Sequence, residues 1–155
     1  MSKRQINIAV DAMGGENSPY KVLKGAEIFQ KENTDTLITL FGDEKIIKSQ
    51  LKINSINLRN YKIENTSNNV MDDDNANTIL RSRKNSSIFK GLEFVKNTSH
   101  SGFVSAGNTA AIMILSRLLI GMIEGIDRPA ICSLVPNRKN YSIMLDLGAN
   151  VSVTP

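Results

Sequence analysis

Short apolar runs alternate along the chain with longer stretches whose apolar residues recur at helical spacing. The run Ile6–Val10 carries Ile6, Ile8 and Val10 and predicts a buried strand, whereas the spacing of apolar residues over 20–31 predicts a helix. By the same reasoning we expect further strands over 36–41, 58–63, 102–105, 131–135 and 142–147, and helices over 43–52, 79–83, 86–97 and 109–124.

This order of elements predicts an α/β fold. Strands and helices that alternate with short connections favour a doubly wound, mostly parallel sheet with right-handed crossovers. The loop 136–140 divides the last two strands and predicts a hairpin, whereas 65–77 is polar and predicts a long loop. We find no internal repeat and no clear linker, so we treat residues 1–155 as a single α/β domain.

The first junction between strand and helix holds an acid and a glycine pair. Asp11 ends the strand, and Gly14 and Gly15 permit a turn in which a Cβ would clash. Ser18 is a good N-cap and Pro19 suits the first helical position. The turn either binds no ligand or directs several N–H groups at an anion, above all a phosphate. Asp11 is a candidate catalytic residue that either orients backbone donors or acts as a base.

A second junction follows the strand predicted at 102–105. Ser105, Gly107, Asn108 and Thr109 lie where that strand ends, and ligands of open α/β sheets bind at this edge. Asn108 or Thr109 can simply cap the next helix. Alternatively, these residues bind phosphate or a thioester oxygen through N–H, amide and hydroxyl donors, with Asn108 as a candidate catalytic residue. We expect both junctions to lie at one edge of the sheet and to face a common cleft.

A basic segment precedes the helix predicted over 86–97. It offers Lys84, Asn85 and Ser86 as contacts for phosphate or a carrier protein, after Arg81 and Arg83. Charge runs of this kind are more often solvated surface ahead of a capped helix, so both interpretations stay open.

Composition excludes several classes of function. The net charge is +4 with 41% hydrophobic residues, and neither a transmembrane run nor a secretory leader is evident, so we expect a cytoplasmic globular protein. The single cysteine, Cys132, agrees with a reducing compartment. The sequence has no arginine-rich stripe with interleaved aromatic residues and therefore gives no indication of nucleic-acid binding. The adjacent acids of Met71–Asn75 cannot converge on one metal ion, and the lone His100 supports no catalytic triad.

Five segments in this order and spacing resemble one known family over essentially the whole chain. They read IAVDAMGGENSP (residues 8–19), RSRKNSS, SAGNTAA, GIDRPAI and DLGANV. Together they are similar to the phosphate acyltransferases of bacterial phospholipid synthesis, the PlsX type. Glu16, Asn17 and Ala110 stand where that family usually has Asp, often His, and Gly. Family members run to about twice this length, so the chain resembles the first half of one.

The resemblance implies a fold like that of isocitrate and isopropylmalate dehydrogenases. It also implies conversion of acyl-acyl-carrier-protein and inorganic phosphate to acyl phosphate and free carrier protein, without a cofactor or metal. It implies a homodimer at the inner face of the membrane. The residues implied for the site are Asp11, Gly14, Gly15, Lys84, Asn85, Ser86, Ser105, Gly107, Asn108 and Thr109.

Two alternatives remain beside acyl transfer. One is a nucleotide-dependent dehydrogenase of related fold, although no G-x-G-x-x-G follows a strand. The other is a half-protein that folds but lacks a complete site. The helix 109–124 is apolar on nearly all sides, which predicts that the chain self-associates through it or exposes a large apolar patch, and that it lacks acyltransferase activity by itself.

Overall fold

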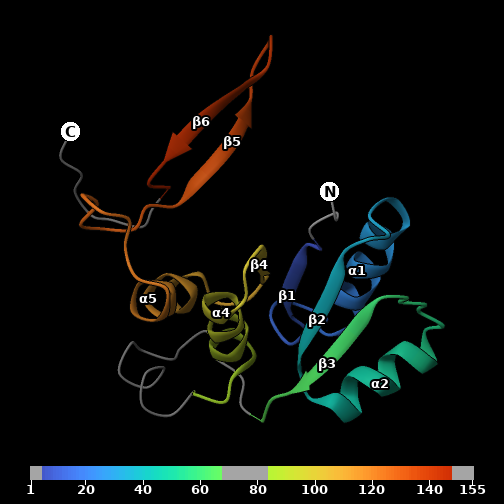
Figure 1. Cartoon of the computed structure of the whole chain (residues 1–155). Coiled ribbons are helices and arrows are strands. Elements are labelled where there is room, and N and C mark those ends of the chain that lie inside the picture. The colour runs from blue at the N-terminus through green and yellow to red at the C-terminus, as the bar shows by residue number, and fades with distance from the viewer. Residues whose placement is uncertain (1–4, 68–83, 148–155) are drawn as a thin grey trace. The chain divides into compact units, whose positions relative to one another are not determined.

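The computed structural model describes residues 5–67 and 84–147, which form two compact units, Met1–Ile120 and Gly121–Pro155. In the first unit, strands and helices alternate along the chain (Figure 1). Its strands are β1 (Asn7–Asp11), β2 (Leu37–Gly42), β3 (Tyr61–Asn65) and β4 (Ser101–Val104), and its helices are α1 (Tyr20–Glu32), α2 (Glu44–Ile53), α4 (Ser87–Asn97) and α5 (Thr109–Leu119).

The four strands of the first unit form one sheet in the order β3-β2-β1-β4, and every pairing is parallel. In register, Ile8 of β1 pairs with Ile38 of β2 on one side and with Gly102 of β4 on the other. The predicted α/β class with a mostly parallel sheet is therefore confirmed. Because all strands point the same way, their carboxyl ends share one edge, and the junctions that follow β1 and β4 meet there.

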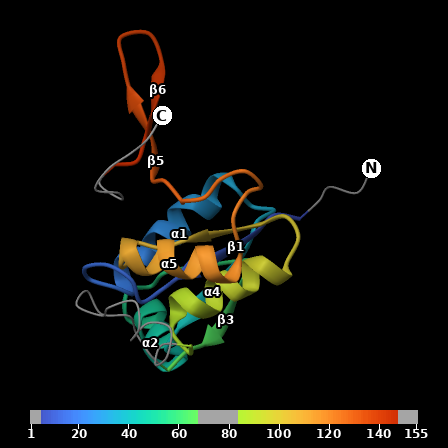
Figure 2. The same cartoon turned by 90° about the vertical axis from the view of Figure 1, so that its left-hand side faces the viewer.

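Helices cover both faces of this sheet (Figures 1 and 2). α1 and α2 lie on one face, and α4 and α5 on the other. The core on the α1 side is built from Val10, Ala12, Leu23, Ala26, Ile38, Leu40, Ile47, Ile56 and Leu58. The core around α4 and α5 is smaller and holds Ile88, Leu92, Ala111 and Leu115. The scarcity of aromatic residues in the sequence is reflected in these mainly aliphatic cores.

The second unit contains the predicted hairpin. β5 (Cys132–Pro136) and β6 (Tyr141–Leu145) pair antiparallel, with Leu134 opposite Ile143. Asn137 shapes the turn, because its Oδ1 accepts hydrogen bonds from the backbone N–H of Lys139 at 2.9 Å and of Asn140 at 2.8 Å. An Asn that bonds its own turn in this way is a common device in loops.

Three predicted boundaries are wrong. The helix predicted over 109–124 ends at Leu119, because Gly121 adopts a φ of +95°, a backbone conformation that stops helices and that glycine tolerates best. The strand predicted over 58–63 is Tyr61–Asn65, where it pairs in register with β2. Ser18 is not the cap of α1, since the helix begins at Tyr20 after Pro19, and the Ser18 hydroxyl donates to the carbonyl of Gly14 instead.

The helix after Asn108 leaves part of its apolar surface uncovered in this chain, in agreement with the exposed apolar residues that the sequence predicts. α5 buries Ala111 and Leu115 against α4, while Leu118 is 56% exposed. Ile112 and Leu119 are partly buried against the same core, whereas Leu118 and Ile120 are exposed. Several other predictions concern segments outside the described residues: the helix over 79–83, most of the loop 65–77 with Met71–Asn75, and both Arg81 and Arg83.

Candidate functional site

The carboxylate of Asp11 ties together the two junctions at the carboxyl edge of the sheet. Asp11 is the last residue of β1 and only 1% exposed. Its Oδ1 accepts the backbone N–H of Met13 at 3.1 Å, and its Oδ2 accepts the hydroxyl of Ser105, from the junction after β4, at 2.7 Å. Burying a carboxylate is costly unless it is hydrogen-bonded, and these two contacts supply that compensation.

Ser105 connects the Asp11 carboxylate to the backbone of the second junction. While its hydroxyl donates to Asp11, its oxygen accepts the backbone N–H of Gly107 at 3.0 Å. The hydroxyl has one hydrogen, which is committed to the carboxylate, so Ser105 meets Gly107 as an acceptor. These hydrogen bonds link Asp11 through Ser105 to Gly107, although Asp11 and Ser105 are 94 positions apart in the sequence. They hold the start of the second junction in place.

The glycines at these junctions are required by close contact between the two loops. A Cβ built on Gly14 would overlap Oδ2 of Asp11 and lie 2.8 Å from the backbone nitrogen of Gly107. Gly15 has a φ of +87°, a region that other residues rarely adopt. The first glycine turn thus packs directly on the second junction, a structural reason for the glycines that holds whether or not an anion binds.

Asn108 fixes the amino end of α5. It is the N-cap, and its Oδ1 accepts the backbone N–H of Ala111 at 2.8 Å. Thr109 and Ala110 form the exposed first turn, and N–H groups at this position have no carbonyl within their own helix to bind. The capping role considered for Asn108 is thus observed, and the capped turn presents N–H donors and the positive end of the helix dipole to solvent.

The basic segment lies before α4. Ser86 is buried and caps that helix, because its Oγ accepts the N–H of Phe89 at 3.2 Å, whereas Lys84 and Asn85 are exposed. α4 leads into the parallel strand β4, so its amino end lies toward the carboxyl edge of the sheet. Hydrogen bonds and close packing join Asp11, Gly14, Ser105 and Gly107 directly, and Lys84 and Asn85 lie outside that cluster.

The prediction that the two junctions share one edge of the sheet is confirmed, because β1 and β4 are parallel neighbours and Asp11 contacts Ser105. Sequence reasoning predicted this shared edge but missed the direct packing of Gly14 on Gly107. The spacing of glycines within either loop could not reveal it, since the contact depends on the pairing of β1 with β4, which are distant in sequence.

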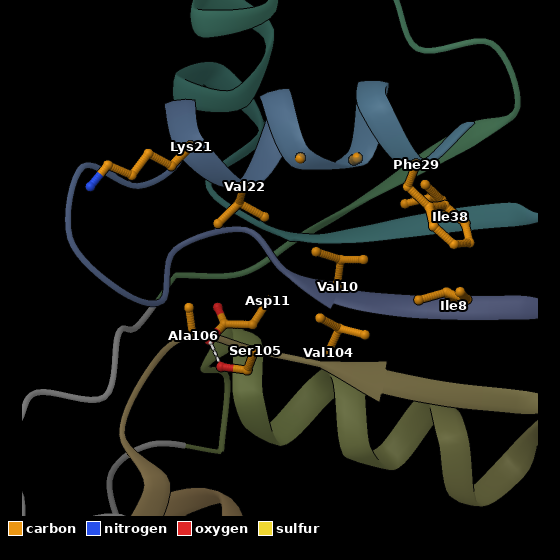
Figure 3. Close-up of a pocket in the computed structure, with 12 residues that line it drawn as sticks. Ile8, Val10, Asp11, Lys21, Val22, Phe29, Ile38, Val104, Ser105 and Ala106 are labelled. Carbon is orange, nitrogen blue, oxygen red and sulfur yellow. Dashed lines mark hydrogen bonds between the residues drawn. The ribbon is translucent and has the colours of Figure 1, made fainter. Parts of the chain in front are cut away.

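A cavity of about 390 Å³ begins at these junctions and runs along the α1 face of the sheet (Figure 3). Asp11, Ser105 and Ala106 line one end, with Lys21 beside them. The remaining lining is apolar: Ile8, Val10, Val22, Gly25, Ala26, Phe29, Ile38 and Val104. Over residues 5–67 and 84–147, no group of three or more His, Cys, Asp or Glu is placed to hold a metal ion, and no helix is long and apolar enough to cross a membrane.

A parallel sheet with paired strand-to-helix junctions at its carboxyl edge is typical of α/β proteins that bind ligands at that edge. Comparison with known proteins gives a more specific result. The model of the fatty acid synthesis protein family matches residues 6–155, and the chain belongs to that family.

Curated relatives agree with this assignment. The chain is similar to proteins named phosphate acyltransferase from Pelagibacter ubique (41% identical), Magnetococcus marinus (39%) and Caldicellulosiruptor bescii (35%). These matches cover 97%, 94% and 97% of this chain but only 44%, 42% and 45% of the respective relatives. The chain therefore spans less than half the length of the curated relatives that it matches.

Proposed function

We propose that the protein serves in phosphate acyltransfer, in which inorganic phosphate accepts the acyl group of acyl-acyl-carrier-protein. Family membership and the names of the relatives support this reaction over the dehydrogenase alternative. The structural observation that carries the proposal is the capped amino end of α5, which Ser105 and Gly107 connect to the buried Asp11 at the carboxyl edge of the sheet. A helix amino end with fixed N–H donors suits a phosphate.

In the proposed reaction, a phosphate oxygen attacks the carbonyl carbon of the thioester. A C–O bond forms, the C–S bond breaks, and the carrier-protein thiolate leaves with the electron pair and then takes up a proton. A thiol has a pKa near 8.5, so the thiolate leaves readily and no covalent enzyme intermediate is required. The protein needs to position phosphate beside the carbonyl and to stabilise the oxyanion that develops.

The geometry divides the candidate residues between two roles. Gly107 N–H is already donated to Ser105, and Asn108 Oδ1 already accepts from Ala111, so these groups position the junction. The first-turn N–H groups of Thr109 and Ala110, with the Thr109 hydroxyl, are then the proposed phosphate donors. Asp11 acts through Ser105 as a positioning residue, while Gly14, Gly15, the exposed Lys84 and Asn85 and the buried Ser86 border the proposed phosphate site.

Partners follow from the same proposal. Acyl-carrier-protein is the acyl donor, and the chain's net charge of +4 favours an acidic partner and an anionic surface. We further propose a homodimer that works in the cytoplasm at the inner face of the membrane, as the resemblance implies. Its sheet architecture is that of the isocitrate dehydrogenase-like group.

Asn108 provides the test. Replacing Asn108 with Ala should weaken phosphate binding by about 1–2 kcal/mol, the usual cost of losing an N-cap, because the first-turn donors of α5 would no longer be held in place. Isothermal titration calorimetry of the chain with inorganic phosphate measures this directly. Asn108→Ser retains a capping oxygen and should restore part of the affinity.

Asp43→Ala is the matched control, because it removes the cap of α2, where the Oδ1 of Asp43 accepts the N–H of Ile46 at 3.0 Å, and leaves α5 intact. It should cost a similar amount of stability and leave phosphate affinity nearly unchanged. Equal affinities for the wild-type chain and Asn108→Ala would contradict the proposed site, as would a wild-type chain that binds no phosphate.

A further inference from the structure

Among the described residues of the first unit, 5–67 and 84–120, a helix packs on one face of the strand β4 and leaves its other face open. Phe103 points toward α4, where its ring occupies the space that a side chain at Gly91 would need. Its neighbour Val104 points to the opposite face, since side chains alternate along a strand, and is 55% exposed. Gly102 lies on the same face as Val104, and a Cβ built there would meet no atom within 4 Å.

The cavity described above lies over this uncovered strip of sheet. It is bounded by β4 and β1 below and by α1 on one side, and its apolar lining extends well beyond the Asp11–Ser105 pair (Figure 3). We call this feature the α1–β4 groove. Strands of parallel sheets are normally covered on both faces, so an apolar groove of this kind marks a place where a covering layer belongs.

The side of α1 that borders the groove has the pattern of a helix-packing surface. Leu23 and Ala26 pack on the sheet, and Val22, Gly25 and Phe29 form a second apolar stripe at spacings of three and four residues. Gly25 is costly in the middle of a helix, and a Cβ built on it would meet nothing within 4 Å. A bare position between two large apolar residues lets another helix approach closely, at the 8–10 Å between axes that is typical of such pairs.

We propose that the α1–β4 groove is the docking surface for an amphipathic helix. This helix would come from the part of the longer phosphate acyltransferases that lies outside the region matched by this chain. The helix would lie beside α1, with its apolar face over Gly25 and Val104. The relatives supply the material for it, because the matched region is 44% of the Pelagibacter ubique protein. Since one end of the groove reaches Asp11 and Ser105, the docked helix would also close one side of the proposed phosphate site.

A helix fits these observations better than a fatty acyl chain does. The groove is bordered by a continuous stripe on α1 and by an open strand, which are the two surfaces that a helix contacts in a layered α/β fold. An acyl chain would need no second stripe on α1 and no bare glycines on both walls. Binding of an acyl chain, or of a second copy of this chain, is an outcome that the experiment below distinguishes.

The experiment measures how accessible the groove is to a thiol reagent. Val104→Cys and, as a control, Ile28→Cys are made in a Cys132→Ser background, because Cys132 is a free, exposed cysteine. The control is well matched, since Ile28 is 58% exposed and lies on α1, yet does not line the groove. Each thiol is labelled with maleimide in the 155-residue chain and in a fusion that continues this chain with the remaining sequence of the Pelagibacter ubique relative.

We expect the Val104→Cys thiol to react freely in the 155-residue chain and about tenfold or more slowly in the fusion, because a buried thiol reacts only through opened states. The Ile28→Cys thiol should react at similar rates in both. Should the fusion fail to fold, the same two positions in the intact Pelagibacter ubique protein provide the comparison. This readout requires no enzymatic activity and is therefore independent of the proposed function.

Four results would overturn the proposal. Equal labelling of Val104→Cys in the short and the long protein would show that no helix covers the groove. Protection in the 155-residue chain that increases with its concentration would identify a second copy as the occupant. Protection of that chain by palmitate would identify an acyl ligand. Slow labelling at every concentration without ligand would show that the 155 residues already cover the groove.

Discussion

The sheet of the first unit and the hairpin of the second contain similar apolar strands with very different surroundings. In β2, Leu40 is completely buried between neighbouring strands and α1. In β6, Ile143 is 67% exposed, although it pairs with another apolar residue, Leu134, on the neighbouring strand β5. Within residues 121–147 no second layer of structure lies over this hairpin, whereas the sheet has helices on both faces. An apolar strand is therefore no guarantee of a buried one.

The two regions also differ in the range of the contacts that hold them. The sheet joins segments far apart in sequence, as when the N–H of Asn57 donates to Glu27 and Ser105 donates to Asp11. The hairpin relies on neighbours in sequence, with Asn137 bonding residues two and three positions ahead. Long-range contacts carry a larger cost in loop entropy, so they form only where burial offsets it.

The largest expected effect separates these regions by stability. Leu40→Ala should lower the free energy of unfolding of the first unit by about 2–5 kcal/mol, because it leaves a cavity in a packed core. Ile143→Ala should change it by less than about 0.5 kcal/mol, as is usual for exposed positions. Urea denaturation followed by far-ultraviolet circular dichroism measures both. A loss from Ile143→Ala as large as that from Leu40→Ala would show that the hairpin has a packed partner.

A smaller effect should distinguish tight from open positions inside the sheet region. Gly14→Ala should cost about 1–3 kcal/mol, because its new methyl group would overlap the Asp11 carboxylate and crowd Gly107. Gly102→Ala is the control, since a Cβ there meets no atom within 4 Å. Thermal and urea unfolding of both variants provide the comparison. If the two substitutions cost the same, the contact between the two junctions does not contribute to stability.

The smallest expected effect concerns the long-range contacts of Glu27. The backbone N–H of Asn57 and, next, the ammonium of Lys24 hold the pKa of Glu27 below its ordinary value of 4.5. A lowered pKa means that ionised Glu27 favours the folded state above pH 4.5, and that this contribution disappears as the pH falls through the lowered value. The Glu27→Gln variant should therefore lose less stability than the wild type when the pH falls from about 6 to about 3, an interval that includes this transition.

Urea midpoints of the wild type and Glu27→Gln across that interval are the measurement. Glu44→Gln provides a control, because the carboxylate of Glu44 pairs with Lys48 one turn away in the same helix. Identical pH profiles for wild type and Glu27→Gln would show that the Glu27–Asn57 contact is not formed in solution.

Much of the fold could be predicted from local patterns. β1, β2, α2 and α4 lie within one or two residues of their predicted ranges, and Asp43 caps α2. The patterns sufficed there because apolar spacing and capping chemistry agree. They failed at two boundaries for different reasons. The positive φ of Gly121, a local feature, ends α5, whereas pairing with the separate strand β2 sets the position of β3.

The candidate site divides in the same way. The sequence alone revealed the strand end, acid and glycine turn at Asp11–Gly15 and the capping Asn108. Each of these features depends on only a few consecutive residues. Self-association of the chain and the catalytic roles remain predictions. The hydrogen bond from Ser105 to Asp11 was not predictable, since it requires knowing that β4 lies beside β1.

The sequence by itself determined the alternation of strands and helices, most of their boundaries, and the residue types offered at the carboxyl edge, because these depend on spacing and on backbone preferences within short segments. Only the tertiary structure decided the strand order β3-β2-β1-β4, the close contact of Gly14 with Gly107, and which apolar side chains are buried. Burial is a property of neighbours, and the neighbours of Leu40 and Ile143 lie elsewhere in the chain or in another layer of structure.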